Sequence, residues 1–502
     1  RSRIIEERGA ALAFRHELVR DALVAGTTAA RRAFVHREAA RVLHSRSRHD
    51  PLQVAWHAQR GGDLDLAADA LVDAAAVAFD RYDLVLAEQL LDQAVELTDP
   101  VAARLARARV RIARWNIAGA HADTTRAIEL GAGAQGLEVA AWVEYYRRDY
   151  DLAHRYAEEA AASTDDPGLR ASCLAMSGRV LHARGDLPDA EPRLAEAVAT
   201  APAAVRGFAQ VWMASLRAHQ GHTAEAVDLV DRAFAQRQWL GHPFAVHHGH
   251  MWRTLALGQR GRVLDALRAS DEARDAAIAS SEAGARFICA VNNVRSWLLR
   301  GLGRLEEADE LSANVLDVTT ADGTVSMNEM RHASMLDLLD GRLLAGDLDG
   351  AAVALERAAP VETLHGTMAW HHRQRYWVQC ARFALATGDP EAARARAQQA
   401  IVDAEQRGSD RYGYFARVVA TRVAVGLGED FDHDAVDEVL AGLERCGGLE
   451  AWLVTAELAA ATGVDRWWRD AERRAGALVA VSGEHAEPLR QWIGTRFAAL
   501  GR

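Results

Sequence analysis

Residues Ala175–Pro202 read AMSGRVLHARGDLPDAEPRLAEAVATAP, and this stretch decides the fold. Its apolar spacing predicts two helices joined by a tight turn at Gly185, the second ending at Pro202. Gly178 and Ala190 are small, as two helices require where they cross at close range. Gly185 tolerates the positive φ that a tight turn needs. The stretch therefore predicts a closely packed helical hairpin.

The small residues and the terminal proline of this hairpin resemble those of a tetratricopeptide repeat. Glycines that start a turn recur along the chain, each with an alanine five positions later; they are Gly185, Gly221, Gly261, Gly303, Gly346 and Gly388, followed by Ala190, Ala226, Ala266, Ala308, Ala351 and Ala393. The intervals of 36, 40, 42, 43 and 42 residues exceed the roughly 34 of a standard repeat. We therefore expect helices or inter-unit turns that are one to two turns longer.

Similar turns are predicted in the first third of the chain, at residues 62–64, 81–84, 119–121 and 148–150. Each hairpin is apolar on two faces and cannot bury both alone, so neighbours must stack. We expect an all-α fold, a tetratricopeptide-like right-handed superhelix of stacked helical hairpins. An ordinary helical bundle is the alternative, and the regular glycine-to-alanine registration disfavours it.

Composition agrees with this fold class and narrows the function. Half of the 502 residues are hydrophobic, but only 6% are aromatic, and alanine and leucine dominate. No lysine occurs, which excludes a P-loop lysine or a Schiff-base lysine. The formal charge of −11 disfavours a broad nucleic-acid surface.

The chain shows no apolar run of the ~20 residues that a membrane span requires, and no signal peptide. We therefore expect a soluble, cytoplasmic protein that does not contact a membrane. The cysteines are Cys173, Cys289, Cys380 and Cys446; they are far apart, without a CxxC pair, and are expected to be buried small hydrophobes.

The first 45 residues differ from the repeats and carry a denser arginine load. The run FRHELVRDAL at residues 14–23, followed by Arg31-Arg32 and His36-Arg37, resembles the end of the winged-helix region in large ATP-dependent transcriptional regulators. These are the MalT-like, large LuxR-type members of the signal-transducing NTPase class. The resemblance implies a nucleotide-binding domain upstream and a helical-repeat sensor downstream. The chain begins with Arg1 rather than Met, so we expect a piece of a longer product.

The expected domains are therefore three. Residues 1–48 form the end of the winged-helix region, residues 49–427 the repeat superhelix, and residues 428–502 degenerate repeats with a capping helix. No helix-turn-helix is recognisable at the C-terminus, although the family usually ends in one, so we expect that the chain either stops short of it or belongs to a variant without it. DNA would then be contacted only through a domain absent here.

No catalytic motif emerges: GxxxxGK[ST], a strand-borne GxGxxG, GxSxG and HExxH are all missing. We expect no enzyme activity and no cofactor in this piece, with ATP bound by the upstream domain. Residues 241–250 hold four histidines, of which His247 and His250 share a helical face as two metal ligands would. No acid or cysteine follows nearby, so a polar helix start is favoured over a metal site. His371-His372 is interpreted likewise as a polar helix N-terminal region.

The concave face is the expected binding surface. In tetratricopeptide repeats the second, fifth, ninth and twelfth residues of each first helix point inward, and each turn glycine marks the fifteenth position. This register predicts ligand or partner contacts for Arg179, His182, His248, Met251, Asn293, Trp297, Arg300, Arg375 and Arg382. Such a lining suits an amphipathic small molecule or peptide with an anionic group, because arginine and amide donors orient it. The alternative is that the tryptophans only fill gaps between helices.

These observations predict the sensor and protein-interaction part of an ATP-dependent transcriptional regulator. An effector in the groove would control the chain's own ATPase domain or a protein partner. The second hypothesis is a free-standing repeat scaffold or peptide receptor without an ATPase in cis. A third, an α-toroidal or metal-dependent enzyme, would need clustered carboxylates or a ligand triad, and the sequence shows neither.

Overall fold

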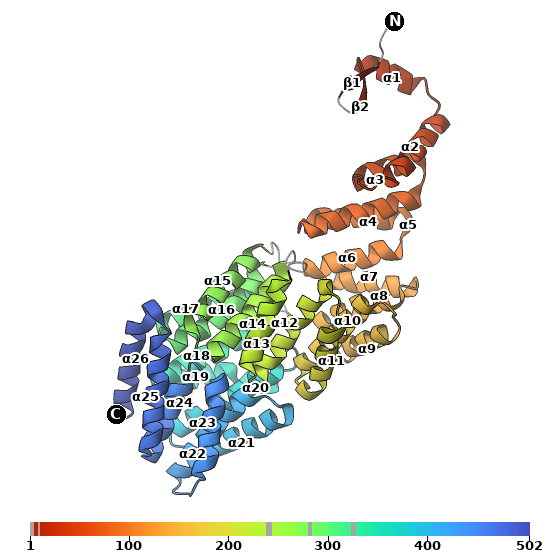
Figure 1. Cartoon of the computed structure of the whole chain (residues 1–502). Helices are drawn as coiled ribbons and strands as arrows, with labels where there is room; N and C mark the ends of the chain where they lie inside the picture. The colour runs from red at the N-terminus through yellow and green to blue at the C-terminus, as the bar shows by residue number, and fades with distance from the viewer. Residues whose placement is uncertain (1–4, 9–10, 237–242, 280–283, 323–327) are drawn as a thin grey trace. The chain divides into compact units, whose positions relative to one another are not determined.

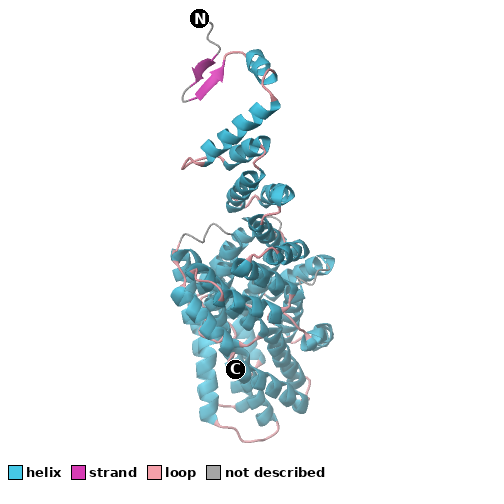
Figure 2. Ribbon diagram, turned by 90° about the vertical axis from the view of Figure 1, so that its right-hand side faces the viewer, coloured by secondary structure: helices cyan, strands magenta, loops and turns pink. Residues whose placement is uncertain are grey.

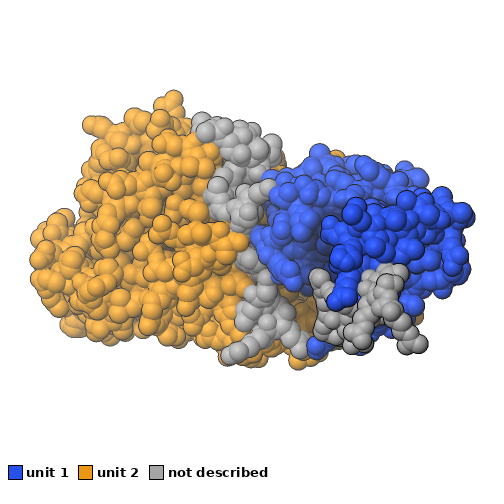
Figure 3. All heavy atoms as spheres, turned by 90° about the horizontal axis from the view of Figure 1, so that it is seen from above, with its two compact units in different colours: residues 1–139 blue, residues 140–502 orange. Residues whose placement is uncertain are grey.

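The structure is a computed structural model that describes residues 5–8, 11–236, 243–279, 284–322 and 328–502. The described residues are overwhelmingly helical, with one short strand hairpin near the N-terminus (Figures 1 and 2). The chain divides into two compact units, residues 1–139 and residues 140–502, which Figure 3 colours separately. The predicted all-α repeat fold is confirmed.

Unit 1 begins with an antiparallel pair in which Ile5 lies opposite Phe14. Its elements are β1 (Ile5–Arg8), β2 (Ala11–Phe14), α1 (Glu17–Ala25), α2 (Ala29–His44), α3 (Pro51–Gly61), α4 (Leu64–Asp80), α5 (Leu84–Thr98), α6 (Val101–Ala113), α7 (Ile117–Glu129) and the first half of α8 (Gly133–Arg147). The assignment of residues 1–48 to a winged-helix region stays a prediction, as do the boundaries after residues 48 and 427.

Unit 2 continues with helical hairpins in which a first and a second helix alternate. The pairs are α8 with α9 (Tyr150–Ala162), α10 (Pro167–Arg184) with α11 (Leu187–Thr200), α12 (Ala203–His219) with α13 (Thr223–Ala235), α14 (Pro243–Gln259) with α15 (Val263–Ala279), α16 (Gly284–Gly301) with α17 (Leu305–Asp322) and α18 (Asn328–Ala345) with α19 (Leu348–Ala358). After the 3₁₀ helix η4 (Ala359–Thr363) come α20 (Ala369–Ala386) with α21 (Pro390–Arg407), α22 (Asp410–Gly426) with α23 (His433–Cys446), α24 (Ala451–Thr462) with α25 (Asp465–Ala480), η5 (Gly483–His485) and α26 (Ala486–Ala499).

The hairpin of Ala175–Pro202 forms as expected. Gly185 has φ +93°, the left-handed conformation that the turn requires. A Cβ on Gly178 would lie 2.6 Å from Leu194 Cγ, which shows how closely α10 and α11 approach. Ala190 and Ala197 are fully buried at the same contact.

Most of the longer repeat intervals come from longer helices, but between Gly346 and Gly388 the short α19 (11 residues) is followed by η4 and a longer connection. The helices α6, α7 and α9 have 13 residues each, whereas α10, α16, α18 and α20 have 18. Five additional residues amount to about 1.4 turns, as expected. Left-handed turn glycines also recur at Gly428 and Gly463, so regular hairpins continue past the point where the sequence pattern loosens.

One predicted turn is wrong. Residues 119–121 lie inside α7, and the turn falls at Trp115-Asn116 instead. Trp115 has φ +65°, and the side chain of Asn116 caps α7 by accepting a hydrogen bond from the N–H of Gly119 at 3.0 Å. As at Tyr82 and Arg148, a left-handed residue other than glycine followed by an Asp or Asn cap carries this turn, and the prediction followed the nearby Gly119 instead.

The superhelix of unit 2 closes on itself, because segments far apart in the sequence touch. The indole N–H of Trp370 donates to the carbonyl of His182 at 3.1 Å, and the N–H of Met368 donates to Ala183 at 3.0 Å. Further along, the N–H of Gly448 donates to the carbonyl of Gln259 at 2.8 Å. We call these the closure contacts. They fold the array around a shared interior.

Candidate functional site

A cavity of about 240 Å³ lies in the interior of unit 2, and we call it the central cavity. Side chains of α12, α14, α16, α18, α20, α22 and α24 line it. All of these are first helices of their hairpins, the helices that the repeat register places on the inner face. Its volume is somewhat below the roughly 300–1,000 Å³ of common small-molecule sites.

The structure brings most of the predicted contact residues to this cavity. Those that line it are Met251, Asn293, Trp297, Arg300, Arg375 and Arg382. They come from three different helices, α14, α16 and α20, so the register derived from the turn glycines assembled one common site. Whether they touch a ligand stays a prediction.

Arg179, His182 and His248 lie outside the cavity lining. The guanidinium of Arg179 stacks 4.6 Å from the ring of Trp212, and the ring of His248 lies 5.6 Å from the same ring. His182 is fully buried, with its ring 5.0 Å from that of His219. These three pack against neighbouring repeats, since their part of the inner face is covered by adjacent side chains.

The arginines of the central cavity are already paired with acids. Arg375 donates to Asp337 at 2.7 Å and to Asp340 at 2.8 Å. Arg300, 2% exposed, also donates to Asp337. Burial would raise the pKa of Asp340, but the charges of Arg375 and Arg382 hold that pKa below its usual value.

Formal charges in the lining cancel. Four arginines and four acids line the cavity: Arg300, Arg375, Arg382, Arg411, Glu329, Asp337, Asp340 and Glu450. A net positive surface for an anion, as the sequence predicts, is therefore absent from the described lining. The side chains that could attract an anionic group are neutralised by their neighbours.

An aromatic wall adjoins this charged wall. The indole N–H of Trp297 donates to Glu450 at 2.6 Å, and Glu450 accepts a further bond from Arg411 at 2.8 Å. The guanidinium of Arg411 lies 5.3 Å from the ring of Trp297 and 5.1 Å from that of Phe415. Trp297 thus ties α16 to the start of α24 and lines the cavity at the same time.

Several lining residues were missed by the sequence reasoning. The same register, applied to the units of Gly346 and Gly428, would have placed Ala333, Asp340 and Phe415 on the inner face. Asp337 and Gln379 lie one residue past a register position, and Arg411 precedes the first position of its unit, so only the packing of the long helices reveals them.

The histidine stretch near residue 247 forms no metal cluster within the described residues. His247 is buried, and its Nδ1 lies 3.1 Å from the carbonyl oxygen of Ala273, so it satisfies a backbone group as the favoured interpretation expects. His250 Nδ1 lies 2.9 Å from Glu272. His242 lies outside the described residues.

His371 and His372 lie at the start of α20, as predicted, but His372 does not face solvent. It is 6% exposed, and burial lowers its pKa to about 3. The rings of His371 and His219 are 4.9 Å apart beside the closure contact of Trp370. The four cysteines are buried and free, as expected.

Within the described part of the chain, no helix combines the length and apolar character that crossing a membrane requires. No protein-family model matches the sequence, and a search of curated proteins found no match.

Solved structures do match the fold. The chain is similar to a Rap protein complexed with the competence and sporulation factor, with a TM-score of 0.52, 14% identity, and coverage of 71% of this chain and 99% of that one. It also matches a signal-transduction ATPase of the STAND class with a tetratricopeptide-repeat sensor from Pyrococcus horikoshii, with a TM-score of 0.47, 15% identity, and coverage of 72% of this chain and 57% of that one. The first of these likenesses agrees with the architecture: a tetratricopeptide-like helical-repeat array.

Proposed function

We propose that this chain is the sensor and protein-interaction part of an ATP-dependent transcriptional regulator of MalT-like, large LuxR type. The observation that carries the sensor role is the central cavity, which seven successive first helices line together. The regulator assignment rests on the resemblance at residues 14–37. In this proposal the chain itself is not an enzyme and holds no cofactor, and ATP is bound by an upstream domain.

The closed superhelix suggests how an effector would act. A molecule in the central cavity contacts several repeats at once, and the closure contacts connect α10 with α20. A ligand that fits one curvature better than another shifts the population toward it by the difference in affinity. That shift would reach the upstream ATPase domain or a protein partner through the stacked repeats.

A second candidate is a receptor without an ATPase in cis. The Rap protein supports it, because 99% of that chain is covered and it was crystallised with a factor bound. The coding sequence upstream of Arg1 separates the two candidates. A P-loop and a Walker B motif there would support the regulator, and a start codon directly upstream would support the receptor.

The sensor role is tested by thermal-shift measurements against a library of metabolites and peptides. Ala290 and Ala333 are small residues of the cavity wall, so Ala290→Phe and Ala333→Phe fill space without removing an ion pair. We expect at least one ligand to raise the melting temperature of the wild-type chain and to lose its effect in both variants. A ligand whose effect survives both substitutions binds elsewhere, and that result would contradict a cavity sensor.

A further inference from the structure

The wall formed by α18 and α20 holds buried hydrogen-bond acceptors to which no described residue donates. Asp337 accepts from Arg300 and Arg375 through Oδ1, while its Oδ2 is buried without a partner. Gln379 donates through Nε2 to the carbonyl of Leu336 at 3.0 Å, and its Oε1 is likewise without a partner. Both side chains line the central cavity and are only 1% exposed.

The identity of these atoms as acceptors follows from their partners. Only the amide nitrogen of Gln379 can donate to a carbonyl, so the oxygen is the atom left over. Asp337 is a carboxylate whose Oδ1 accepts from two guanidinium groups, so its second oxygen, Oδ2, is an acceptor as well. A buried acceptor without a donor destabilises the chain, so a site with two of them favours a donor from outside.

The charge of the surroundings selects among donors. Asp337 already lies between two guanidinium groups, so a further cation would be repelled by both. An anion could accept from the ring N–H groups of Trp252 and His372, which also lack a partner in this lining, but it would meet the two unpartnered acceptors and arginines whose charge is balanced. A neutral N–H or O–H group satisfies the acceptors without either penalty.

We propose that the central cavity takes a small uncharged molecule that donates N–H or O–H hydrogen bonds to Asp337 and Gln379. Its apolar body packs against Met251, Leu255 and Val378, which line the same cavity. This inference rests on the proposed sensor function and names the ligand chemistry of that site. It replaces the anionic group expected from the sequence.

The test uses the whole chain and five benzene derivatives of similar size. Benzamide supplies N–H donors, benzyl alcohol an O–H donor, N,N-dimethylbenzamide neither, and benzoate and benzylammonium carry charge. Affinities are measured by ligand-observed saturation-transfer NMR titration. We expect benzamide or benzyl alcohol to bind about tenfold more tightly than the other three, since one buried hydrogen bond is worth roughly that factor.

Two variants assign the effect to the proposed atom. Gln379→Met keeps the length of the side chain and removes the acceptor, so benzamide or benzyl alcohol should bind about tenfold more weakly. Gln398→Met makes the same change at an exposed position of α21 and should leave binding unchanged. The order of the probes on the wild-type chain is informative even if Gln379→Met does not fold.

The possible outcomes distinguish a failure of this inference from a failure of the proposed sensor function. Tightest binding by benzoate or benzylammonium, or unchanged binding in a folded Gln379→Met chain, would overturn the neutral-donor inference and leave the sensor intact. If no probe binds the wild-type chain more than it binds Ala333→Phe, the cavity is not a ligand site and both proposals fail.

Discussion

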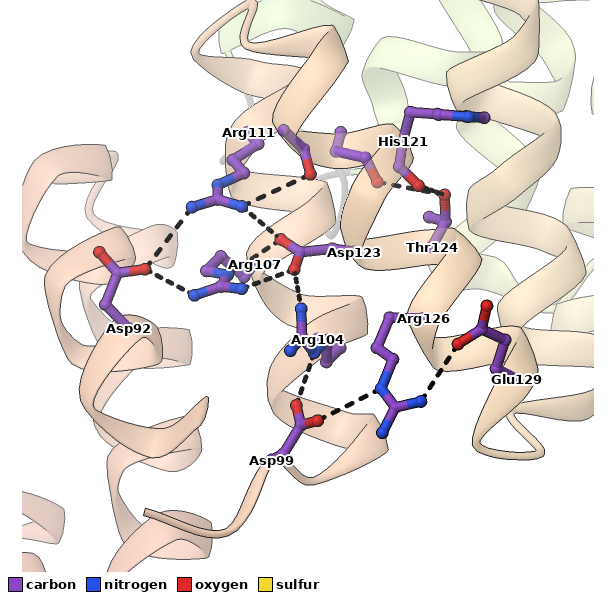
Figure 4. A network of polar contacts seen from close by, with 12 residues as sticks. Asp92, Asp99, Arg104, Arg107, Arg111, His121, Asp123, Thr124, Arg126 and Glu129 are labelled. Carbon is purple, nitrogen blue, oxygen red and sulfur yellow. Dashed lines mark hydrogen bonds and ion pairs between the residues drawn. The ribbon is translucent and has the colours of Figure 1, made fainter. Parts of the chain in front are cut away.

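Replacing Asp123 by alanine should loosen unit 1 at α6 and α7. Asp123 is fully buried on α7 and accepts hydrogen bonds from three arginines of α6 (Figure 4). The distances are 2.9 Å to Arg104 Nη1, 2.6 Å to Arg107 Nη2 and 2.8 Å to Arg111 Nη1. Asp123 therefore joins the two helices of one hairpin, and without it three guanidinium groups lose a shared partner.

The magnitude follows from what remains after the substitution. Removing one partner of a buried ion pair costs about 3–5 kcal/mol. Each arginine keeps a second acid, since Asp99 lies 2.6 Å from Arg104 and Asp92 lies 2.7 Å from Arg107. This retained pairing places the cost near the lower end, at about 3 kcal/mol.

Hydrogen exchange with mass spectrometry measures this cost locally, which suits a repeat protein whose units open separately. In Asp123→Ala, amides of α6 and α7 should exchange about 100-fold faster, whereas those of α20 and α22 should not change. Asp92→Ala is the matched control, because that carboxylate is 44% exposed and its loss should cost below about 1 kcal/mol. Equal exchange in wild type and Asp123→Ala, or equal effects of the two variants, would refute the reasoning.

Three further predictions concern unit 2. Gly185→Ala should cost about 1–2 kcal/mol more stability than Gly388→Ala. Both positions need positive φ, but only at Gly185 would a Cβ meet a side chain, at 2.7 Å from Trp370 Cδ1. Urea denaturation of both variants measures the difference. His372 has its pKa lowered to about 3, so the unfolded chain binds the proton first and stability falls as the pH drops from about 6.5 toward 3. Between pH 7 and 5 this one group should lower the free energy of unfolding by about 2 kcal/mol. The melting temperature of the wild-type chain should therefore fall more over this range than that of His372→Leu. Arg300→Met leaves Asp337 with one guanidinium and should cost about 2–4 kcal/mol; a melting temperature equal to wild type would contradict the pairing.

The repeat architecture was readable in the sequence because it depends on local chemistry. Gly185 must adopt positive φ, and Gly178 must leave space for Leu194, so these residue types mark a hairpin wherever they recur. The same register brought Asn293 and Arg375 to one cavity. The turn prediction failed at Trp115, because the nearby Gly119 was taken for the turn residue although it lies inside α7.

The chemistry of the central cavity was decided by tertiary structure alone. The inner-face register identifies Arg300 and Arg375 as cations, but Asp337, which neutralises them, lies between register positions on another helix. Charge balance depends on distances between neighbouring first helices, and those are set by the packing of successive repeats. The sequence by itself determined the repeat and which helices face inward. Only the packing of successive repeats decided which charges cancel and which acceptors lack a donor, because these contacts join side chains on different helices.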